Sequence, residues 1–382
     1  MNNSTFTDSK PHYALLDGLR GVAALLVLWY HVNEGFGFAR WVNGAGDGMV
    51  EVFNHGYLAV DFFFILSGFV IGYAYDDRWQ CGFTVREFCR RRLIRLHPMV
   101  VMGAVIGLVC FVLQGGVAWD GTRAAASMVM LSLLMAMFMV PAVPGAPCDV
   151  RGNGEMFPLN GPAWSLLFEY IGNILYALFI RRLPTRVLAV VTAVLGAGLV
   201  WFTASDASHT GSFGVGWTLD GLNLWGGMLR MMFPYTLGML LARVFRPVRV
   251  RGAFWLCALA LAGLFAVPCI APSASGLCLN GVYEAVCIVL VFPVIVWLAA
   301  SGATTDGAST AVCCFLGDIS YPLYMVHYPV MYLFYSWLIK SRQYTFADTW
   351  AASLGVMLAC MLLAWLALRF YDLPVRRWLS RR

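Results

Sequence analysis

The chain has 382 residues, of which 60% are hydrophobic and only 12% are charged, and its mean hydropathy is +0.72. A soluble domain of this length is far more polar, so the composition excludes that class and indicates a membrane protein. The formal charge of +6 does not indicate nucleic-acid binding, because the arginines gather in loops beside apolar segments, as membrane topology requires.

Eleven apolar segments are candidates for membrane helices. In chain order they are residues 13–33, 57–75, 98–114, 125–143, 162–180, 184–203, 225–244, 253–271, 281–300, 315–339 and 348–370. Uninterrupted apolar runs of about 20 residues predict membrane helices rather than the strands of a β-barrel. We therefore expect an all-α polytopic membrane protein with a single domain over residues 1–382, a short polar N-terminus at 1–12 and a basic C-terminal tail at 371–382.

Arginine-rich connections indicate which ends of these segments face the cytoplasm. These connections follow the second, fifth, seventh and last segments. If all eleven segments crossed the membrane, the connection after the second segment would lie on one side and the other three on the opposite side. We therefore expect residues 125–143 to form a re-entrant or partly buried helix, because Pro141 and Pro144 end it and the stretch to Gly161 is polar. That count gives about ten transmembrane helices with both termini cytoplasmic. The alternative is that the orientation rule fails at one loop.

The first segment places ionisable side chains on one face of a helix. Arg20 and His31 are eleven residues apart, which is almost three helical turns. Asp17 precedes Arg20 by three positions and Glu34 follows His31 by three, so all four groups lie on one side. Because an unpaired charge is costly in hydrocarbon, this stripe is expected to face a protein interior or a wet cavity.

Two later segments carry carboxylates that are expected at the depth of His31. Asp61 and Glu169 both lie near the outer starts of helices that run inward. Buried ionisable groups need mutual partners or water, and a carboxylate beside an imidazole is a common arrangement of a general base. We therefore expect Asp61 or Glu169 to orient the ring of His31. For Glu169, a structural hydrogen bond between helices is the alternative.

The run FCRRRLIRLHP places Arg91, Arg92 and Arg95 three and four residues apart, close to the membrane surface. Ordinary topology marking is the alternative, but guanidinium groups suit phosphate oxygens. We therefore expect a pocket for a phosphorylated cytosolic molecule.

A late proline-containing segment, GDISYPLYMVHYPVMY, sets Ser320, Tyr324 and His327 on one face. This pattern predicts a bent helix that lines a cavity. The alternative is a tolerated proline whose neighbouring hydroxyl groups are satisfied within the helix.

Taken together, these segments resemble the membrane acyltransferase family 3, whose members O-acylate glycans, lipopolysaccharide, peptidoglycan and some natural products. Five ordered motifs between residues 16 and 329 carry the resemblance. They are Arg20 and His31 in LDGLRGVAALLVLWYH, Asp61 and Ser67 in AVDFFFILSGF, Arg91, Arg92, Arg95 and Pro98 in the basic run, Trp164, Ser165 and Glu169 in WSLLFE, and Ser320, Tyr324, His327 and Pro329 in SYPLYMVHYP.

The resemblance implies an integral membrane O-acyltransferase of the bacterial cytoplasmic (inner) membrane. It implies acyl-CoA, with acetyl-CoA the expected form, as donor, and a hydroxyl of an extracytoplasmic or membrane-associated glycan or glycolipid as acceptor. No metal is expected, because the cysteines lack metal-type spacing with a nearby histidine. Arg91, Arg92 and Arg95 would bind the donor phosphates. The expected catalytic group is His31, Arg20, Asp61 and Glu169, and the expected substrate-binding residues are Asp17, Glu34, Ser320, Tyr324 and His327.

In this mechanism His31 removes the proton of the acceptor hydroxyl for direct attack on the thioester, and an acyl-histidine intermediate is the open variant. A transporter or flippase for a lipid-linked or glycan substrate is the alternative function, since it could also line a cavity with these groups. Transporters often contain repeated broken helices, and this sequence contains no such repeat.

Overall fold

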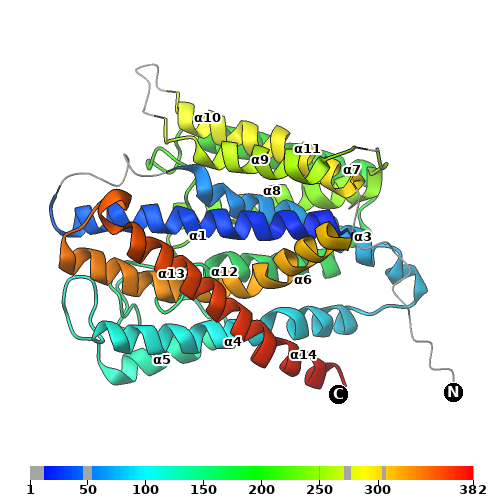
Figure 1. Cartoon of the computed structure of the whole chain (residues 1–382). Helices are drawn as coiled ribbons and strands as arrows, with labels where there is room; N and C mark the ends of the chain where they lie inside the picture. The colour runs from blue at the N-terminus through cyan, green and yellow to red at the C-terminus, as the bar shows by residue number, and fades with distance from the viewer. Residues whose placement is uncertain (1–12, 46–53, 249, 271–276, 303–306, 382) are drawn as a thin grey trace.

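The structure is a computed structural model that describes residues 13–45, 54–248, 250–270, 277–302 and 307–381, and these ranges contain helices and no strands. The helices pack side by side in one bundle (Figure 1). In chain order they are α1 (Ala14–Val42), η1 (His55–Leu58), α3 (Ala59–Tyr75), η2 (Arg78–Cys81), α4 (Val85–Gln114), α5 (Ala126–Met137), α6 (Ala163–Leu178), η3 (Ile180–Arg182), α7 (Thr185–Ala204), α8 (Gly221–Val244), α9 (Ala253–Ala266), α10 (Leu279–Val286), η4 (Cys287–Val291), α11 (Phe292–Ser301), α12 (Gly307–Ser341), α13 (Phe346–Ala367), η5 (Leu368–Asp372) and α14 (Leu373–Ser380).

The predicted all-helical class is confirmed for the described residues. Eight described helical segments are long and apolar enough to cross a membrane. The predicted segments around α5, α8 and α9 are helical as well, but α5 and α9 contain only 12 and 14 residues. The number of about ten crossings stays a prediction.

The helix α5 is too short for a full crossing. Its 12 residues extend over about 18 Å, whereas the hydrocarbon layer is about 30 Å thick. The chain on its two sides also meets: the Trp119 amide donates to the Arg151 carbonyl at 3.1 Å, and Arg151 donates to Gln114 Oε1 at 2.6 Å. This geometry favours the predicted re-entrant segment within residues 125–143.

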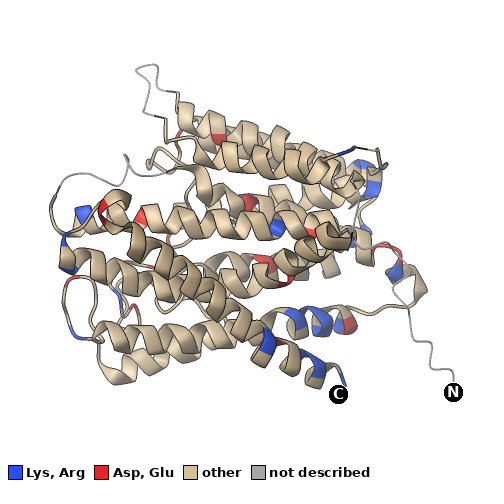
Figure 2. Ribbon diagram, viewed as in Figure 1, with Lys and Arg blue, Asp and Glu red and all other residues tan. Residues whose placement is uncertain are grey.

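The first and last helices, α1 and α14, begin and end at the same end of the bundle (Figure 1). Figure 2 shows that Lys and Arg positions, coloured blue on the ribbon, gather there, along the first turns of α4 and along α14. Arg243 of α8 joins this region, because its Nε donates to Asp76 Oδ2 at 2.8 Å just after α3. We call this the basic end and the opposite one the far end. That the basic end is cytoplasmic stays a prediction.

Two pairs of helices approach closely because glycines lie between them. The first pair is α1 and α12, where a Cβ on Gly21 would lie 2.4 Å from the Leu316 carbonyl oxygen. The second is α3 and α8, where a Cβ on Gly68 would lie 2.0 Å from the Tyr235 carbonyl oxygen. This close packing at Gly68 fixes α3 against α8.

We expect Gly68→Ala to lower the thermal unfolding temperature in detergent, because its methyl group has no room beside the Tyr235 backbone. Overpacking of this kind costs about 1–3 kcal/mol. Gly263→Ala in α9 is the matched control, since its Cβ would meet no atom within 4 Å. Equal unfolding temperatures for Gly68→Ala and the parent protein would contradict the close α3–α8 contact.

Candidate active site

Two cavities lie along the bundle, one toward the basic end and one toward the far end. The basic-end cavity has a volume of about 120 Å³ and is lined by side chains from α1, α3, α4, α6 and α12. The far cavity has a volume of about 750 Å³ and is lined by α1, α12 and the loops around α6 and α8. Val60 and Tyr324 line both cavities, so the two are neighbours that meet at these side chains.

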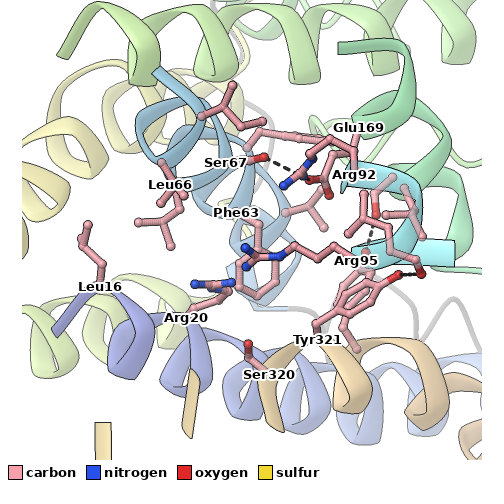
Figure 3. A pocket seen from close by; sticks show the side chains of 18 residues that line it. Leu16, Arg20, Phe63, Leu66, Ser67, Arg92, Arg95, Glu169, Ser320 and Tyr321 are labelled. Atoms are coloured by element: carbon pink, nitrogen blue, oxygen red, sulfur yellow. Dashed lines mark hydrogen bonds and ion pairs between the residues drawn. The ribbon is translucent and has the colours of Figure 1, made fainter. Parts of the chain in front are cut away.

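The basic-end cavity holds guanidinium groups from two helices. Arg20 of α1 and Arg95 of α4 reach into it from different walls (Figure 3). Arg92 is buried and donates to Glu169 Oε1 at 2.5 Å, and Ser67 donates to the same oxygen at 3.0 Å. Because Arg95 has no hydrogen-bond or ion-pair partner among the described residues, its guanidinium remains available to an anion.

The predicted arginine trio is not one cluster. Arg92 and Arg95 line the basic-end cavity, whereas Arg91 is exposed and stacks its guanidinium over the Phe83 ring at 5.2 Å. Arg91 therefore does not line this cavity, because its position on the helix turns it toward the surface. The spacing placed the three residues near one another but did not show which of them faces inward.

The far cavity contains His31 with a carboxylate partner. His31 Nδ1 lies 2.5 Å from Glu34 Oε2, and Tyr335 donates its hydroxyl to the same carboxylate oxygen at 2.8 Å. Aromatic rings surround the imidazole: Tyr328 lies 4.6 Å and His327 5.2 Å from it between ring centroids. With Nδ1–H donating to Glu34, Nε2 keeps its lone pair and can accept a proton.

The expectation that Asp61 or Glu169 orients His31 is wrong. Asp61 is fully buried and accepts hydrogen bonds from Arg230 Nε at 3.2 Å and Nη2 at 2.8 Å. Glu169 lies in the basic-end cavity with Arg92. The physical reason is that each carboxylate neutralises an arginine of a neighbouring helix, whereas the partner of His31 lies one turn away on its own helix.

Arg230 is a site residue that the sequence reasoning missed. It lines the far cavity, where Asp61 and the carbonyl oxygens of Val215 at 2.8 Å and Tyr57 at 3.1 Å hold it. A signal was present, because Arg230 stands inside the apolar segment 225–244 just as Arg20 stands inside the first segment.

Glu155 is the second missed residue of the far cavity. It lies in the loop between α5 and α6, is buried, and accepts a hydrogen bond from the Tyr332 hydroxyl. Burial away from water raises the pKa of this carboxyl group to about 7. Arg151 lies over the Tyr332 ring at 3.6 Å and so fixes the donor. No sequence pattern singled out Glu155, because the loop has no helical periodicity.

The remaining predicted residues fall into three settings. Asp17 forms an ion pair with Arg20 and is not among the residues that line either cavity. Ser320 lines the basic-end cavity, and Tyr324 contacts the Ser165 hydroxyl at 2.7 Å between the two cavities. His327 is buried behind His31 and donates from Nδ1 to the Leu323 carbonyl at 3.0 Å.

The described part of the chain contains no group of three or more His, Cys, Asp or Glu side chains that could hold a metal ion.

We expect Arg230→Met to destabilise the protein by about 3–5 kcal/mol, because it leaves Asp61 buried and uncompensated. Thermal unfolding in detergent measures the change. The double variant Asp61→Leu with Arg230→Met should recover much of the stability, since a buried ion pair can be exchanged for apolar side chains. A double variant as unstable as Arg230→Met alone would refute the ion-pair explanation.

Comparison with known proteins gives a family match for most of the chain. Residues 13–369 match the family model described as an acyltransferase domain. Acyltransferase MdmB of Streptomyces mycarofaciens is 27% identical over 389 aligned residues, which cover 96% of this chain and 92% of that protein.

Two further relatives match shorter stretches. Protein 2 in the picA locus of Rhizobium radiobacter is 32% identical over 189 residues, covering 48% of this chain and 90% of that protein. O-acetyltransferase OatA of Staphylococcus aureus is 35% identical over 100 residues, covering 26% of this chain and 13% of that protein. No solved structure gives a significant match.

Proposed function

Since the chain belongs to the acyltransferase family whose model matches residues 13–369, we propose that it is a membrane O-acyltransferase with acyl-CoA as its donor. It moves a short acyl group, acetyl in the expected case, to a hydroxyl of a glycan, glycolipid or other carbohydrate. The observation that carries the proposal is the meeting of the two cavities at Val60 and Tyr324. One cavity offers unpaired positive charge, and the other offers a paired imidazole.

The donor is assigned to the basic end. Acyl-CoA is cytosolic and carries several phosphate groups, and guanidinium groups bind phosphate oxygens well. Arg95 provides the free charge, Arg92 is held in place by Glu169, and Arg20 faces them from α1. The basic end then faces the cytoplasm of a bacterial inner membrane, in agreement with the positive-inside rule. The thioester arm extends along α3 and α12 toward Tyr324.

The acceptor is assigned to the far cavity, whose volume of about 750 Å³ suits a molecule of one to a few rings. Its hydroxyl oxygen attacks the thioester carbonyl while His31 Nε2 takes the hydroxyl proton. The resulting imidazolium then returns that proton to the departing thiolate, so the enzyme ends unchanged. Glu34 keeps the imidazole in the required tautomer and stabilises its charged form.

The variant route through an acyl-histidine uses the same residues. In that route His31 Nε2 attacks the thioester carbonyl and expels the CoA thiolate. The acceptor hydroxyl then attacks the acyl-imidazole and gives its proton to that thiolate, which restores neutral His31 and releases CoA as the thiol. The transporter alternative is disfavoured, because the relatives named above include an acyltransferase and an O-acetyltransferase.

We expect His31→Ala to bind acyl-CoA normally and to lose acyl transfer by about 10²–10⁴-fold, the usual contribution of a general base. Glu34→Gln should also lose activity, because the amide does not stabilise the imidazolium. Release of CoA by purified protein with a carbohydrate acceptor is the readout, and His209→Asn in an exposed loop is the control. Full activity of His31→Ala would remove His31 from the chemistry.

We expect Arg95→Gln to weaken acyl-CoA binding by at least tenfold, because one charge-assisted contact to phosphate is worth about 1.5–3 kcal/mol. Arg91→Gln removes the same charge from the same helix but from outside the cavity, so it should have a smaller effect. Calorimetric titration of purified protein with acyl-CoA measures both. Equal losses in the two variants would mean that only the general positive potential matters.

A further inference from the structure

The C-terminal helix α14 brings additional arginines to the basic end, and it lies beyond the family match, which ends at residue 369. It packs on α4, and Arg90 of α4 donates to the Leu379 carbonyl at 3.4 Å. Figure 2 shows the Lys and Arg positions of α14 near those at the start of α4 on the ribbon. The two helices therefore form one positively charged surface.

Arg376 connects this surface to the basic-end cavity. Its Nη1 donates at 3.0 Å to Asp372 Oδ2, and Asp372 is buried in η5, which packs against α4 and α12. Arg95 lines the cavity on α4, and Arg376 lies next to α4 because both α14 and η5 pack on that helix. Arg95 is thereby within electrostatic range of Arg376 as well as of Arg20, Arg92 and the Glu169 carboxylate. We call Arg95 and Arg376 the rim pair.

The charges around the rim pair do not balance among the described residues. Of the four arginines, three have carboxylate partners: Asp17 for Arg20, Glu169 for Arg92 and Asp372 for Arg376. Arg95 has no hydrogen-bond or ion-pair partner in the described part of the chain, and the carboxylates nearest to it, Glu169 and Asp372, are already paired with Arg92 and Arg376. Guanidinium groups that face one another without sufficient carboxylates are stabilised by a bound anion.

We infer that the rim pair is a phosphate-binding subsite at the basic end, formed by Arg95 of α4 and Arg376 of α14. This inference rests on the proposed function, because it extends the donor site. Acyl-CoA carries a 3′-phosphate on its ribose in addition to the diphosphate, and a donor with its thioester arm in the cavity leaves the nucleotide at the surface. The phosphate that best fits the rim pair is this 3′-phosphate. A phosphate of an anionic lipid headgroup is the other source with the same chemistry.

The test compares CoA with dephospho-CoA, which lacks only the 3′-phosphate. Calorimetric titration of the detergent-purified full chain should give tighter binding of CoA by about tenfold, the factor for one charge-assisted contact. Arg376→Gln should remove this preference and leave the affinity for dephospho-CoA unchanged. Arg186→Gln, an exposed arginine of α7, is the matched control and should keep the preference.

A second variant separates binding from structure. Asp372→Asn releases Arg376 from its carboxylate, so it should strengthen the preference for CoA over dephospho-CoA. If the ion pair is purely structural, Asp372→Asn and Arg376→Gln should both weaken the binding of CoA. The lipid source is tested in nanodiscs with and without phosphatidylglycerol. If Arg376→Gln loses enrichment of that lipid while its CoA preference is unchanged, the subsite binds lipid phosphate and the assignment to the donor is overturned.

An Arg376→Gln variant that keeps both the CoA preference and the lipid enrichment of the parent protein would overturn the subsite altogether. Failure of the proposed function looks different. In that case the parent protein itself would bind neither CoA nor dephospho-CoA.

Discussion

Neutralisation of arginines inside the bundle is the constraint on which the rest of this structure depends. A guanidinium group keeps its proton at any physiological pH, so burial forces it to find a carboxylate or an equivalent set of oxygens. Arg230 is held by Asp61 at the far cavity, and Arg92 by Glu169 at the basic-end cavity. Each pair joins two helices that are distant in sequence, and Arg230, Arg92 and Glu169 line the cavity walls.

The same constraint separates the structural carboxylates from the one that acts on the imidazole. Asp61 forms an ion pair with Arg230, and Glu169 forms one with Arg92 and also accepts a hydrogen bond from Ser67. Glu34 contacts His31 and tyrosine hydroxyls, and among the described residues no arginine or lysine hydrogen-bonds to it. Only the latter setting leaves a carboxylate to hold an imidazole in one tautomer, which is what a general base requires.

The sequence predicted the helices well because a helix surrounded by lipid or protein interior must be apolar. Such a run of apolar residues can be recognised without knowing how the rest of the chain packs. It also predicted contacts within one helix, since Asp17–Arg20 and His31–Glu34 follow from helical spacing alone. Contacts between helices were beyond it. Nothing in the spacing of Asp61 identifies Arg230 as its partner, because their pairing depends on how α3 packs on α8. The loop residue Glu155 had no periodic neighbours from which a position could be inferred.

The side chains shared by the two cavities have a consequence for membrane permeability. The proposed function joins a donor from one side of the membrane to an acceptor at the other, and an enzyme with such a passage risks becoming a pore through which ions leak. Val60 and Tyr324 stand between the two water-accessible spaces, and the Tyr324 hydroxyl is fixed to Ser165 at 2.7 Å. Under the function proposed above, the arm that carries the thioester would pass between these two side chains, so protein would close the passage when the donor is absent and the donor would fill it when bound.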